Sequence, residues 1–393
     1  MTYRVNPLFS AVAPPPIAEA WSWIAGRTFP DDKPLIDLAQ AEPSYPPAHE
    51  LLQHLAEIIQ QPESSRYTPI QGTPELRTAF AADLTNFYGA NVTAAEVSIT
   101  AGCNQSFCLA LMALAGSGDE VILPAPYYFN HNMWLNMLGV KTVPLPFRAA
   151  EGGIPDVEEA ARKITAQTRA IILVSPNNPT GAIYPPEVIL EFFELAQDRG
   201  IALVLDETYK DYLPNEDAPH ALLQEPGWRA TLIQLFSFSK VYAITGYRVG
   251  GLVAGSEISA EIAKAMDCVA ICAPAIGQAA ALFALQNLDR WKREKRRLSL
   301  ARLEALHHAM ARNELEYQVV CAGAFFAYVR HPHAGKSASE VARRLADEYN
   351  MLCLPGTFFG SDQESYLRFS FANVEANRMD EIAARLVDSQ DAF

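Results

Sequence analysis

Ser237-Phe238-Ser239-Lys240 is followed, eight positions after the lysine, by Arg248 in the segment Thr245-Gly246-Tyr247-Arg248-Val249-Gly250-Gly251. The stretch lies between residues 231–236 and 248–254, which we predict to be strands. A lysine beside small hydroxyl residues can form a Schiff base with a carbonyl compound, and a neighbouring cation lowers its pKa. We therefore predict that Lys240 is a covalent amine and that Ser237 and Arg248 hold a phosphate. From this stretch alone, a surface lysine after a buried strand is an equal alternative.

The composition is that of a globular protein. With 393 residues, of which 50% are apolar, the chain has material for two to three domains. It has no run of 18 or more uncharged apolar residues, and its N-terminus has neither the basic start nor the apolar centre of a signal peptide. We therefore expect a soluble, cytoplasmic protein that does not enter a membrane. The net charge of −14 argues against binding to nucleic acid, whose phosphates repel an acidic surface.

Neither the cysteines nor the basic residues indicate a separate function. The six cysteines lack the paired spacing of metal ligands, so we predict buried thiols and no metal site. The basic run at 290–302 falls on a predicted long helix, and we interpret it as a solvated helix face.

Apolar strands that end in polar residues recur in the first two thirds of the chain. The predicted strands 170–175 and 201–205 are apolar throughout, which implies a parallel sheet covered on both faces. In such sheets ligands bind beyond the carboxyl ends of the strands. The first strand leads to Asn178 in an Asn-Pro-Thr-Gly turn, and the second leads directly to Asp206 and Tyr209. A buried Asp206 needs a cation such as a protonated ring nitrogen, with a helix cap or turn as the alternative.

Two further strand ends carry candidate ligand contacts. The predicted strand 97–100 leads into a helix that starts near Cys103 and Asn104, and the free N–H groups of such a helix start form an anion pocket. Most turns of this kind bind nothing, so this signal is weak alone. Tyr128 lies past the predicted strand 121–123, where an aromatic ring either packs or stacks on a planar ligand.

The composition divides the chain into three parts. Residues 1–45 are proline-rich and cannot form a core, so we expect an arm that packs on the small domain and the site, or else a tether. Residues 46–285 are expected to form a large domain, and residues 286–393 a smaller α/β domain. The expected strands of the smaller domain are 325–329, 351–354 and 366–370. Arg368 lies in the last of these and would need a carboxylate, from a substrate or from an internal acid.

Taken in order, these motifs resemble the class I and II pyridoxal-phosphate aminotransferases of fold type I, from Ala41-Glu42-Pro43 to Leu367-Arg368-Phe369-Ser370. The resemblance implies an α/β fold with a mostly parallel, seven-stranded sheet flanked by helices. It also implies the cofactor pyridoxal 5′-phosphate and a transaminase that moves an amino group from an L-amino acid to a 2-oxo acid. The route would be a Schiff base at Lys240 and a proton shift from Cα to C4′ of the cofactor.

The resemblance also assigns roles to single residues. Lys240, Asp206 and Tyr209 would be catalytic, with Asp206 paired to the pyridinium nitrogen. Asn178 and Tyr209 would hydrogen-bond the phenolic oxygen of the cofactor, and Tyr128 would stack on its ring. The residues implied for the phosphate are Ser237, Arg248, Cys103, Asn104 and, from a neighbouring subunit, Tyr67.

Substrate binding and assembly follow from the same resemblance. Arg368 would bind the α-carboxylate of the substrate, and Asn178 and Ala41 would touch the substrate beside it. Tyr67 lies on a predicted loop before a helix, where packing is its alternative role. Because the matching tyrosine of the family reaches the phosphate of the other subunit, we expect a homodimer with shared active sites.

The sequence departs from the family pattern in two places. Ala41 replaces a glycine and is expected to narrow the substrate site, while Cys103 replaces a serine or another small residue of the phosphate loop. Because a thiol is a weak donor, Cys103 is expected to leave phosphate binding to the backbone. No motif matches the arginine with which aspartate-specific members bind a second carboxylate, although Arg27 and Arg66 are candidate substitutes. We therefore expect neutral or aromatic amino acids as substrates.

Two other functions share the same cofactor contacts. A lyase of this fold would catalyse β-elimination or form a cyclopropane, and it would release ammonia and an oxo acid or a ring product. A cofactor-binding sensor is the third hypothesis, which the lack of a basic DNA-binding extension before residue 40 disfavours.

Overall fold

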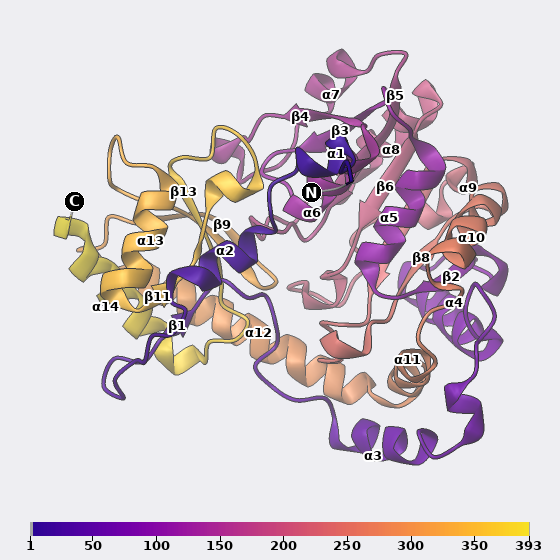
Figure 1. Ribbon diagram of the computed structural model, residues 1–393, viewed down its shortest axis with the longest axis horizontal. Coiled ribbons are helices and arrows are strands. Elements are labelled where there is room, and N and C mark those ends of the chain that lie inside the picture. The colour runs from indigo at the N-terminus through magenta and orange to yellow at the C-terminus, as the bar shows by residue number, and fades with distance from the viewer. Residues whose placement is uncertain (1–2, 393) are drawn as a thin grey trace.

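The computed structural model describes residues 3–392, and its largest element is a seven-stranded sheet (Figure 1). In spatial order the strands are β2 (Val97–Thr100), β8 (Gly250–Val253), β7 (Leu232–Ser237), β6 (Ala202–Asp206), β5 (Thr168–Val174), β3 (Glu120–Pro124) and β4 (Lys141–Leu145). Only β8 is antiparallel to its neighbours. The predicted α/β fold with a mostly parallel sheet is therefore confirmed.

Helices cover both faces of this sheet, because its strands are apolar on both sides. Leu203 and Leu205 of β6 face one core, and Val204 between them faces the other. The first core contains residues of α3 (His49–Ile58), α4 (Pro74–Tyr88), α7 (Val157–Lys163), α8 (Pro186–Arg199), α9 (Trp228–Thr231) and α11 (Ala275–Asn287). The second contains residues of α5 (Cys103–Leu114), α6 (Phe129–Leu138) and α10 (Ser256–Ala270).

A second sheet of four antiparallel strands contains the C-terminal part of the chain. Its order is β12 (Leu354–Pro355), β13 (Tyr366–Ser370), β10 (Phe326–Arg330) and β9 (Gln318–Gly323). The helices around it are α12 (Asp289–Met310), α13 (Ala338–Tyr349) and α14 (Met379–Ser389). The expectation of one strand at 351–354 is wrong, because β11 (Met351–Leu352) pairs with β1 (Ile36–Asp37) while β12 pairs with β13.

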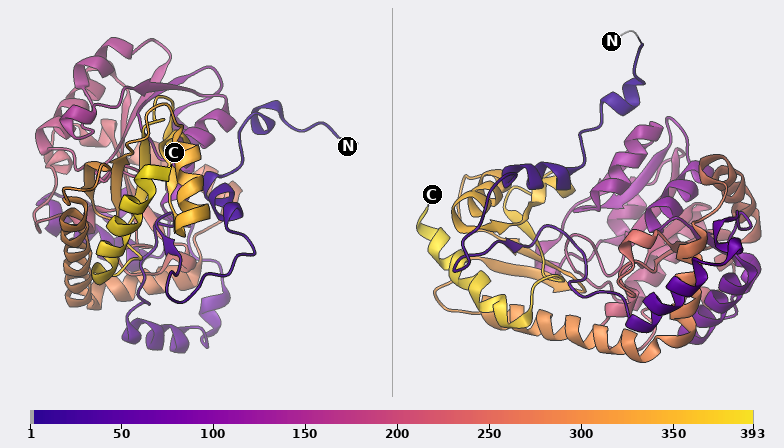
Figure 2. Two further views of the ribbon diagram at one scale, coloured as in Figure 1. Left: turned by 90° about the vertical axis from the view of Figure 1, so that its left-hand side faces the viewer. Right: turned by 60° about the horizontal axis from the view of Figure 1, so that its bottom comes forward.

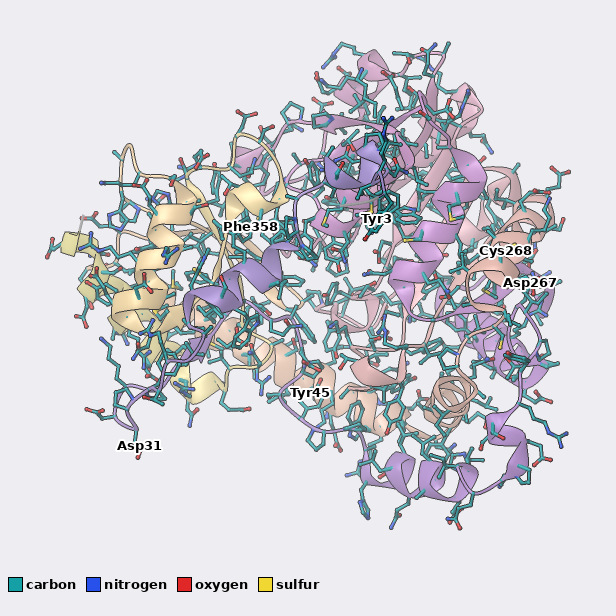
Figure 3. The ribbon with its side chains drawn as sticks, viewed as in Figure 1. Tyr3, Asp31, Tyr45, Asp267, Cys268 and Phe358 are labelled. Carbon is teal, nitrogen blue, oxygen red and sulfur yellow. The ribbon has the colours of Figure 1, made fainter. Side chains whose placement is uncertain are left out.

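The N-terminal segment lies along the outside of this second sheet. It carries α2 (Pro16–Trp23) and, before it, α1 (Pro7–Ser10), which lies beside α6; Figure 2 shows α1 set apart from α2 by an extended stretch. Arg27 fixes the segment by donating to the carbonyl of Ala346, at 2.8 Å, and to Oδ1 of Asn350, at 2.9 Å. The segment then runs back to α12 (Figure 3), where the ammonium of Lys295 lies 4.4 Å from the ring centroid of Tyr45.

Residues 3–392 include no helix of the length and apolar character that crossing a bilayer requires.

Candidate active site

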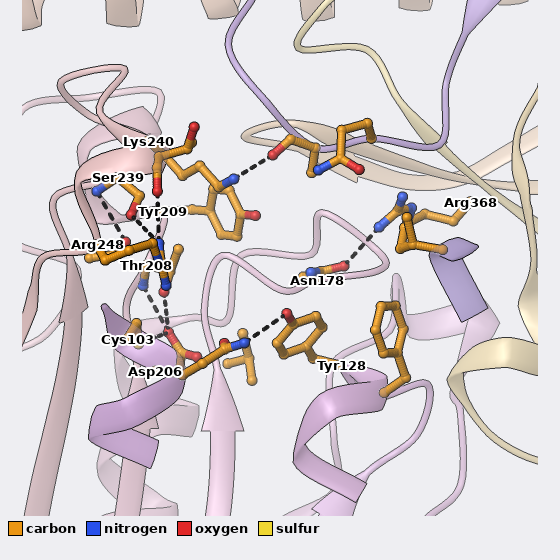
Figure 4. A pocket seen from close by; sticks show the side chains of 18 residues that line it. Cys103, Tyr128, Asn178, Asp206, Thr208, Tyr209, Ser239, Lys240, Arg248 and Arg368 are labelled. Carbon is orange, nitrogen blue, oxygen red and sulfur yellow. Dashed lines mark hydrogen bonds between the residues drawn. The ribbon is translucent and has the colours of Figure 1, made fainter. Parts of the chain in front are cut away.

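A pocket lies beyond the carboxyl ends of β5, β6 and β7 and is bounded on the other side by β13 (Figure 4). Eleven of the twelve residues that we predicted for the site line it: Ala41, Cys103, Asn104, Tyr128, Asn178, Asp206, Tyr209, Ser237, Lys240, Arg248 and Arg368. Segments more than 300 residues apart in the sequence therefore meet at one place.

Tyr67 is the predicted site residue that does not line this pocket. It lies after η1 (Pro62–Ser65), and 79% of its surface is exposed. Its predicted contact was with a second subunit, so its role stays a prediction.

The amine of Lys240 lies just after β7 and faces the pocket (Figure 4). Its Nζ donates a hydrogen bond to the backbone oxygen of Ala41, at 2.5 Å. Burial lowers the pKa of Lys240 to about 8, the charge of Glu42 opposes this shift, and the cations Arg248 and Arg368 add to it. Roughly a tenth of the amine is therefore neutral at pH 7, against less than about one part in a thousand at the ordinary lysine pKa of 10.5, and the neutral form is the one that attacks a carbonyl carbon.

Asp206 ends β6 and is buried at the floor of the pocket. Its Oδ1 accepts hydrogen bonds from Thr208, at 2.9 Å from the backbone N–H and 2.7 Å from the hydroxyl. Its Oδ2 lies 3.5 Å from Nε2 of His131. Burial alone would raise the pKa of Asp206, but His131 and Thr208 outweigh it and hold the pKa below its ordinary value. The carboxylate is therefore ionised and suited to a cationic partner.

The wall of the pocket around Arg248 is cationic and includes a helix start. Arg248 has a left-handed backbone (φ 49°), and its Nη1 donates to the Thr245 carbonyl, at 2.9 Å, and lies 3.5 Å from Oγ of Ser239. Gly102 precedes α5 with φ +90°, and a Cβ at this position would collide with the Arg248 guanidinium. Glycine is thus required for the arginine to lie against the first N–H groups of α5, an arrangement suited to a phosphate.

Arg368 on β13 approaches the pocket from the smaller sheet and is only 2% exposed. Its guanidinium donates to the Ala39 carbonyl and to Oδ1 of Asn178, at 3.5 Å, and lies between the rings of Phe326 and Phe359. No carboxylate of residues 3–392 forms an ion pair with it, and its Nε has no partner there. Burial lowers the pKa of Arg368 to about 10. Its unmet need for an anion points to a ligand carboxylate.

Aromatic side chains form the remaining walls. The hydroxyl of Tyr128 accepts hydrogen bonds from Asn130, at 2.9 Å, and from Asn104, at 3.5 Å. Tyr209 packs edge-on against Phe325 and Phe326, and burial raises the pKa of its phenol, which therefore stays protonated. A flat ligand could be enclosed here between polar ends of opposite charge.

Several residues at the site were not predicted, and three of them, Thr208, Ser239 and His131, are polar. Thr208 follows Asp206 at the spacing of an aspartate turn, so this hydrogen bond could have been expected from the sequence. Ser239 entered the prediction only as part of the lysine motif. His131 carries no motif, and its place beside Asp206 depends on α6 packing its ring on Phe107, with centroids 3.9 Å apart.

The arginines proposed for a second carboxylate lie elsewhere. Arg27 is bound to the end of α13 and forms an ion pair with Asp347, at 3.6 Å. Arg66 caps η1 outside the pocket. Within residues 3–392, Arg248 and Arg368 are the arginines that line the pocket.

The residues present fit pyridoxal 5′-phosphate. The cofactor has an aldehyde, a ring nitrogen that carries a proton and a phosphate, and the pocket offers an amine at Lys240, an anion at Asp206 and a cation at Arg248. The space that Gly102 leaves beside Arg248 suits the phosphate end. Arg368 remains for a second anionic group.

Comparison with known proteins agrees with this geometry. The family model for "Aminotransferase class I and II" matches residues 33–386. An aspartate aminotransferase of Pyrococcus horikoshii is 31% identical over 78% of this chain and 79% of its own, and the aromatic aminotransferase ISS1 of Arabidopsis thaliana is 28% identical over 95% and 92%. The structure of an aspartate aminotransferase from Thermus thermophilus with maleate has a TM-score of 0.88 at 26% identity, covering 98% of this chain and 100% of that one. The chain therefore belongs to the class I and II aminotransferases, the transaminases of fold type I that depend on pyridoxal 5′-phosphate.

Proposed function

We propose that this transaminase divides its work between the two ends of the pocket. The cofactor end consists of Asp206, Lys240 and Arg248, and the substrate end is centred on Arg368. The observation that carries the proposal is that Arg368 is buried with no carboxylate of residues 3–392 in an ion pair with it, in the same pocket as a lysine whose pKa is lowered to about 8.

Each residue has one task in this proposal. Pyridoxal phosphate, when bound, supplies an aldehyde and a ring that accepts electrons from the substrate Cα–H bond. Asp206 keeps a proton on the ring nitrogen, and Tyr209 and Asn178 hydrogen-bond the phenolic oxygen. Lys240 would hold the aldehyde and, as a free amine, would move a proton from the substrate Cα to C4′ of the cofactor.

The phosphate and ring contacts complete the cofactor end. Ser237, Arg248 and the N–H groups of Cys103 and Asn104 are proposed to bind the phosphate. Tyr128 is proposed to lie against the ring, where the hydrogen bond from Asn130, at 2.9 Å, holds its phenol.

At the substrate end, Arg368 is proposed to bind the α-carboxylate beside Asn178 and Ala41. This contact orients the Cα–H bond perpendicular to the ring, which favours proton loss over decarboxylation. The pocket offers no third arginine within residues 3–392, and Ile17 and Phe129 are apolar walls. We therefore propose a neutral or aromatic amino acid as the donor and a 2-oxo acid as the acceptor, while the relatives include both aspartate and aromatic aminotransferases.

We propose that the active unit is a homodimer. The exposure of Tyr67, 79%, and its position outside the pocket of its own chain support a contact with the pocket of a second copy. Sedimentation should give a dimer, and Tyr67→Phe should weaken cofactor binding severalfold. An active monomer would overturn this part of the proposal.

We also propose the division into an arm (1–45), a large domain (46–285) and a small domain (286–393). Domain closure would then bring Arg368 toward Lys240. All six cysteines are free thiols in the described chain, which supports a reducing compartment and hence the cytoplasm.

Two experiments test the assignment of function. Borohydride reduction of the holoenzyme followed by peptide mapping should place the pyridoxyl group on Lys240, and a label on another lysine would refute its role. A panel of amino acids should convert the bound cofactor to its amine form with one oxo acid released per site. Release of ammonia with pyruvate would instead favour a lyase.

A further inference from the structure

The thiol of Cys103 contacts the carboxylate at the floor of the pocket. Its Sγ lies 3.6 Å from Oδ1 of Asp206, within the range of a hydrogen bond to sulfur, and the residue is only 8% exposed (Figure 4). The side chain at the start of α5 thus has a polar partner inside the pocket.

The two oxygens of Asp206 have unequal surroundings. Oδ1 accepts from the N–H of Thr208, at 2.9 Å, from its hydroxyl, at 2.7 Å, and from the thiol. Among the residues that the structure describes, Oδ2 has a single polar contact, Nε2 of His131 at 3.5 Å. Donors on one oxygen fix the rotation of the carboxylate and leave the other oxygen available to a ligand.

The thiol can act only as a donor in this place. Burial and the negative charge of Asp206 raise the pKa of Cys103 well above its ordinary value, although Thr208 and Arg248 act in the opposite direction. The sulfur therefore keeps its proton, and the S–H is directed at an acceptor with a full charge.

We propose that Cys103 is a positioning residue for Asp206: its S–H, together with Thr208, holds Oδ1 so that Oδ2 faces the ring nitrogen of the bound cofactor. The inference rests on the proposed pairing of Asp206 with that nitrogen. It separates two tasks at one residue, because the backbone N–H of Cys103 serves the phosphate while its side chain serves the opposite end of the ring.

The backbone of this residue is fixed independently of its side chain. Gly250 of β8 packs so closely that a Cβ there would lie 2.6 Å from the Cys103 nitrogen. Replacing the thiol should therefore leave the start of α5 in place and change chiefly the surroundings of Asp206. This makes side-chain variants at position 103 informative.

The test uses Cys103→Ala, Cys103→Ser and the control Cys108→Ala. Cys108 lies on the same helix, and its hydrogen bond with Trp134 uses only its carbonyl, which alanine keeps. The apoenzymes are titrated with pyridoxal phosphate, and the absorbance of each holoenzyme is followed against pH. Because a hydrogen bond contributes about 0.5–1.5 kcal/mol, Cys103→Ala should raise the Kd of the cofactor roughly twofold to twelvefold.

The pH titration of cofactor absorbance gives a second measurement, its midpoint, which a simple loss of packing at position 103 would not change. Without the S–H donor, the carboxylate of Asp206 is more basic and takes a larger share of the proton on the ring nitrogen of the cofactor. The pH midpoint of the absorbance change should therefore be higher in Cys103→Ala than in the wild type. Cys103→Ser keeps an O–H donor and should stay near the wild type in both Kd and midpoint, as should Cys108→Ala.

The outcomes separate this inference from the proposed function. The positioning role would be overturned if Cys103→Ala left Kd and midpoint unchanged, or if Cys103→Ser raised Kd as much as Cys103→Ala. In either case Asp206→Asn would still weaken cofactor binding, and the proposed function would stand. If Asp206→Asn binds the cofactor as tightly as the wild type, the pairing of Asp206 with the ring nitrogen fails, and the role of Cys103 fails with it.

Discussion

Buried charges occur in two regions of this molecule, and the same residue types behave differently in each. One region is the pocket, with Asp206, Lys240 and Arg368. The other lies outside it, with Glu207, Lys210 and Arg302. We call the first group the open charges, because their partners within the chain are incomplete, and the second group the closed charges.

Each closed charge has a charged or titratable partner within 3.3 Å, although Nε of Arg302 accounts for no hydrogen bond in the described chain. Glu207, next to Asp206 in the sequence, accepts from the hydroxyl of Tyr88, at 2.6 Å, and from Gln234, and lies 3.3 Å from Nε2 of His220. A carboxylate of this kind is satisfied by the fold alone. Asp206 differs because Oδ2 has a single contact at 3.5 Å.

The cations show the same contrast. Lys210 pairs with Asp211, at 3.1 Å, and although burial opposes its charge, Asp211 and Asp83 hold its pKa above the ordinary value. Burial instead lowers the pKa of Lys240 to about 8. Arg302 binds Glu375, at 2.5 Å, and Ser44, at 2.8 Å. The contrast teaches that the lack of a close charged partner within residues 3–392, more than burial, distinguishes a charge that awaits a ligand.

The largest effect should separate the two lysines. Lys240→Ala removes both the amine that binds the cofactor and the base that moves the Cα proton, so kcat should fall by about 10⁴-fold or more. Lys210→Met should keep kcat within about threefold while lowering the apoenzyme's melting temperature, because Asp211 loses its nearest partner. Steady-state kinetics and thermal unfolding check both, and a comparable loss of kcat in Lys210→Met would break the comparison.

The adjacent carboxylates should separate next. Asp206→Asn cannot hold a proton on the ring nitrogen, and a lost buried charge pair of about 3–5 kcal/mol corresponds to a fall of roughly 10²- to 10⁴-fold in kcat/KM. Glu207→Gln should act mainly on the free energy of unfolding, since its partners all belong to the fold. Denaturant titration of both apoenzymes distinguishes these effects. Equal catalytic loss in Glu207→Gln at full folding would contradict the distinction.

The arginines should differ in KM. Arg368→Lys replaces a two-pronged donor with a point charge, and a charge-assisted hydrogen bond of about 1.5–3 kcal/mol predicts a rise in the amino acid KM of roughly 10- to 100-fold. Cofactor affinity should not change. Arg302→Lys should leave KM unchanged and cost about 2 kcal/mol of stability, because the Ala372 carbonyl and Glu375 lose donors. A raised KM in Arg302→Lys would place it among the open charges.

The open charges could be predicted from the sequence because each follows or lies in an apolar strand. Asp206 ends β6, Lys240 follows β7 closely, and Arg368 lies within β13, so their burial and a shared sheet edge for Asp206 and Lys240 followed from the pattern. The place of Arg368 in the same site came from the resemblance. The partners could not be predicted in the same way. His131 and Glu207 gain their roles from helix packing and from Tyr88, 119 residues away from Glu207, which no local pattern reports.

The strands of the two sheets also show how far the sequence pattern can predict structure. Its central strands are continuous apolar runs and were found, whereas β4 was missed because Pro144 interrupts it and it is partly exposed at the edge of the sheet. β9 was missed because its alternating residues are only partly buried. The number of strands came from the resemblance and not from the periodicity, and the order of the strands was not predicted.

The smallest expected effect concerns how the charge of Glu42 changes the pH at which Lys240 captures the cofactor. Burial holds the pKa of Lys240 at about 8, below its ordinary value of 10.5, so cofactor capture by the apoenzyme should speed up as pH rises through about 8 and then level off. The unfolded chain binds this proton more tightly, so the stability contributed by the neutral amine is present above pH 10.5 and is lost as pH falls toward 8. Stopped-flow capture rates, recorded from about two pH units below this midpoint to about two above it, follow the titration directly.

Replacing Glu42 should change the pH midpoint of cofactor capture by Lys240. The charge of Glu42 favours the ammonium form of Lys240, so Glu42→Gln should lower the capture midpoint further and raise the rate at pH values below it. The Glu42 carboxylate also accepts a hydrogen bond from the Thr245 hydroxyl, at 2.5 Å, which the variant weakens. Thr245→Val is the control: it removes this hydrogen bond but keeps the charge of Glu42, so its capture midpoint should equal that of the wild type. Glu50→Gln, on the exposed side of α3, controls for net charge. A capture midpoint in the wild type near the pKa of a free lysine would contradict the lowered pKa of Lys240. A midpoint unchanged in Glu42→Gln would show that burial and the neighbouring arginines determine this pKa without a contribution from Glu42.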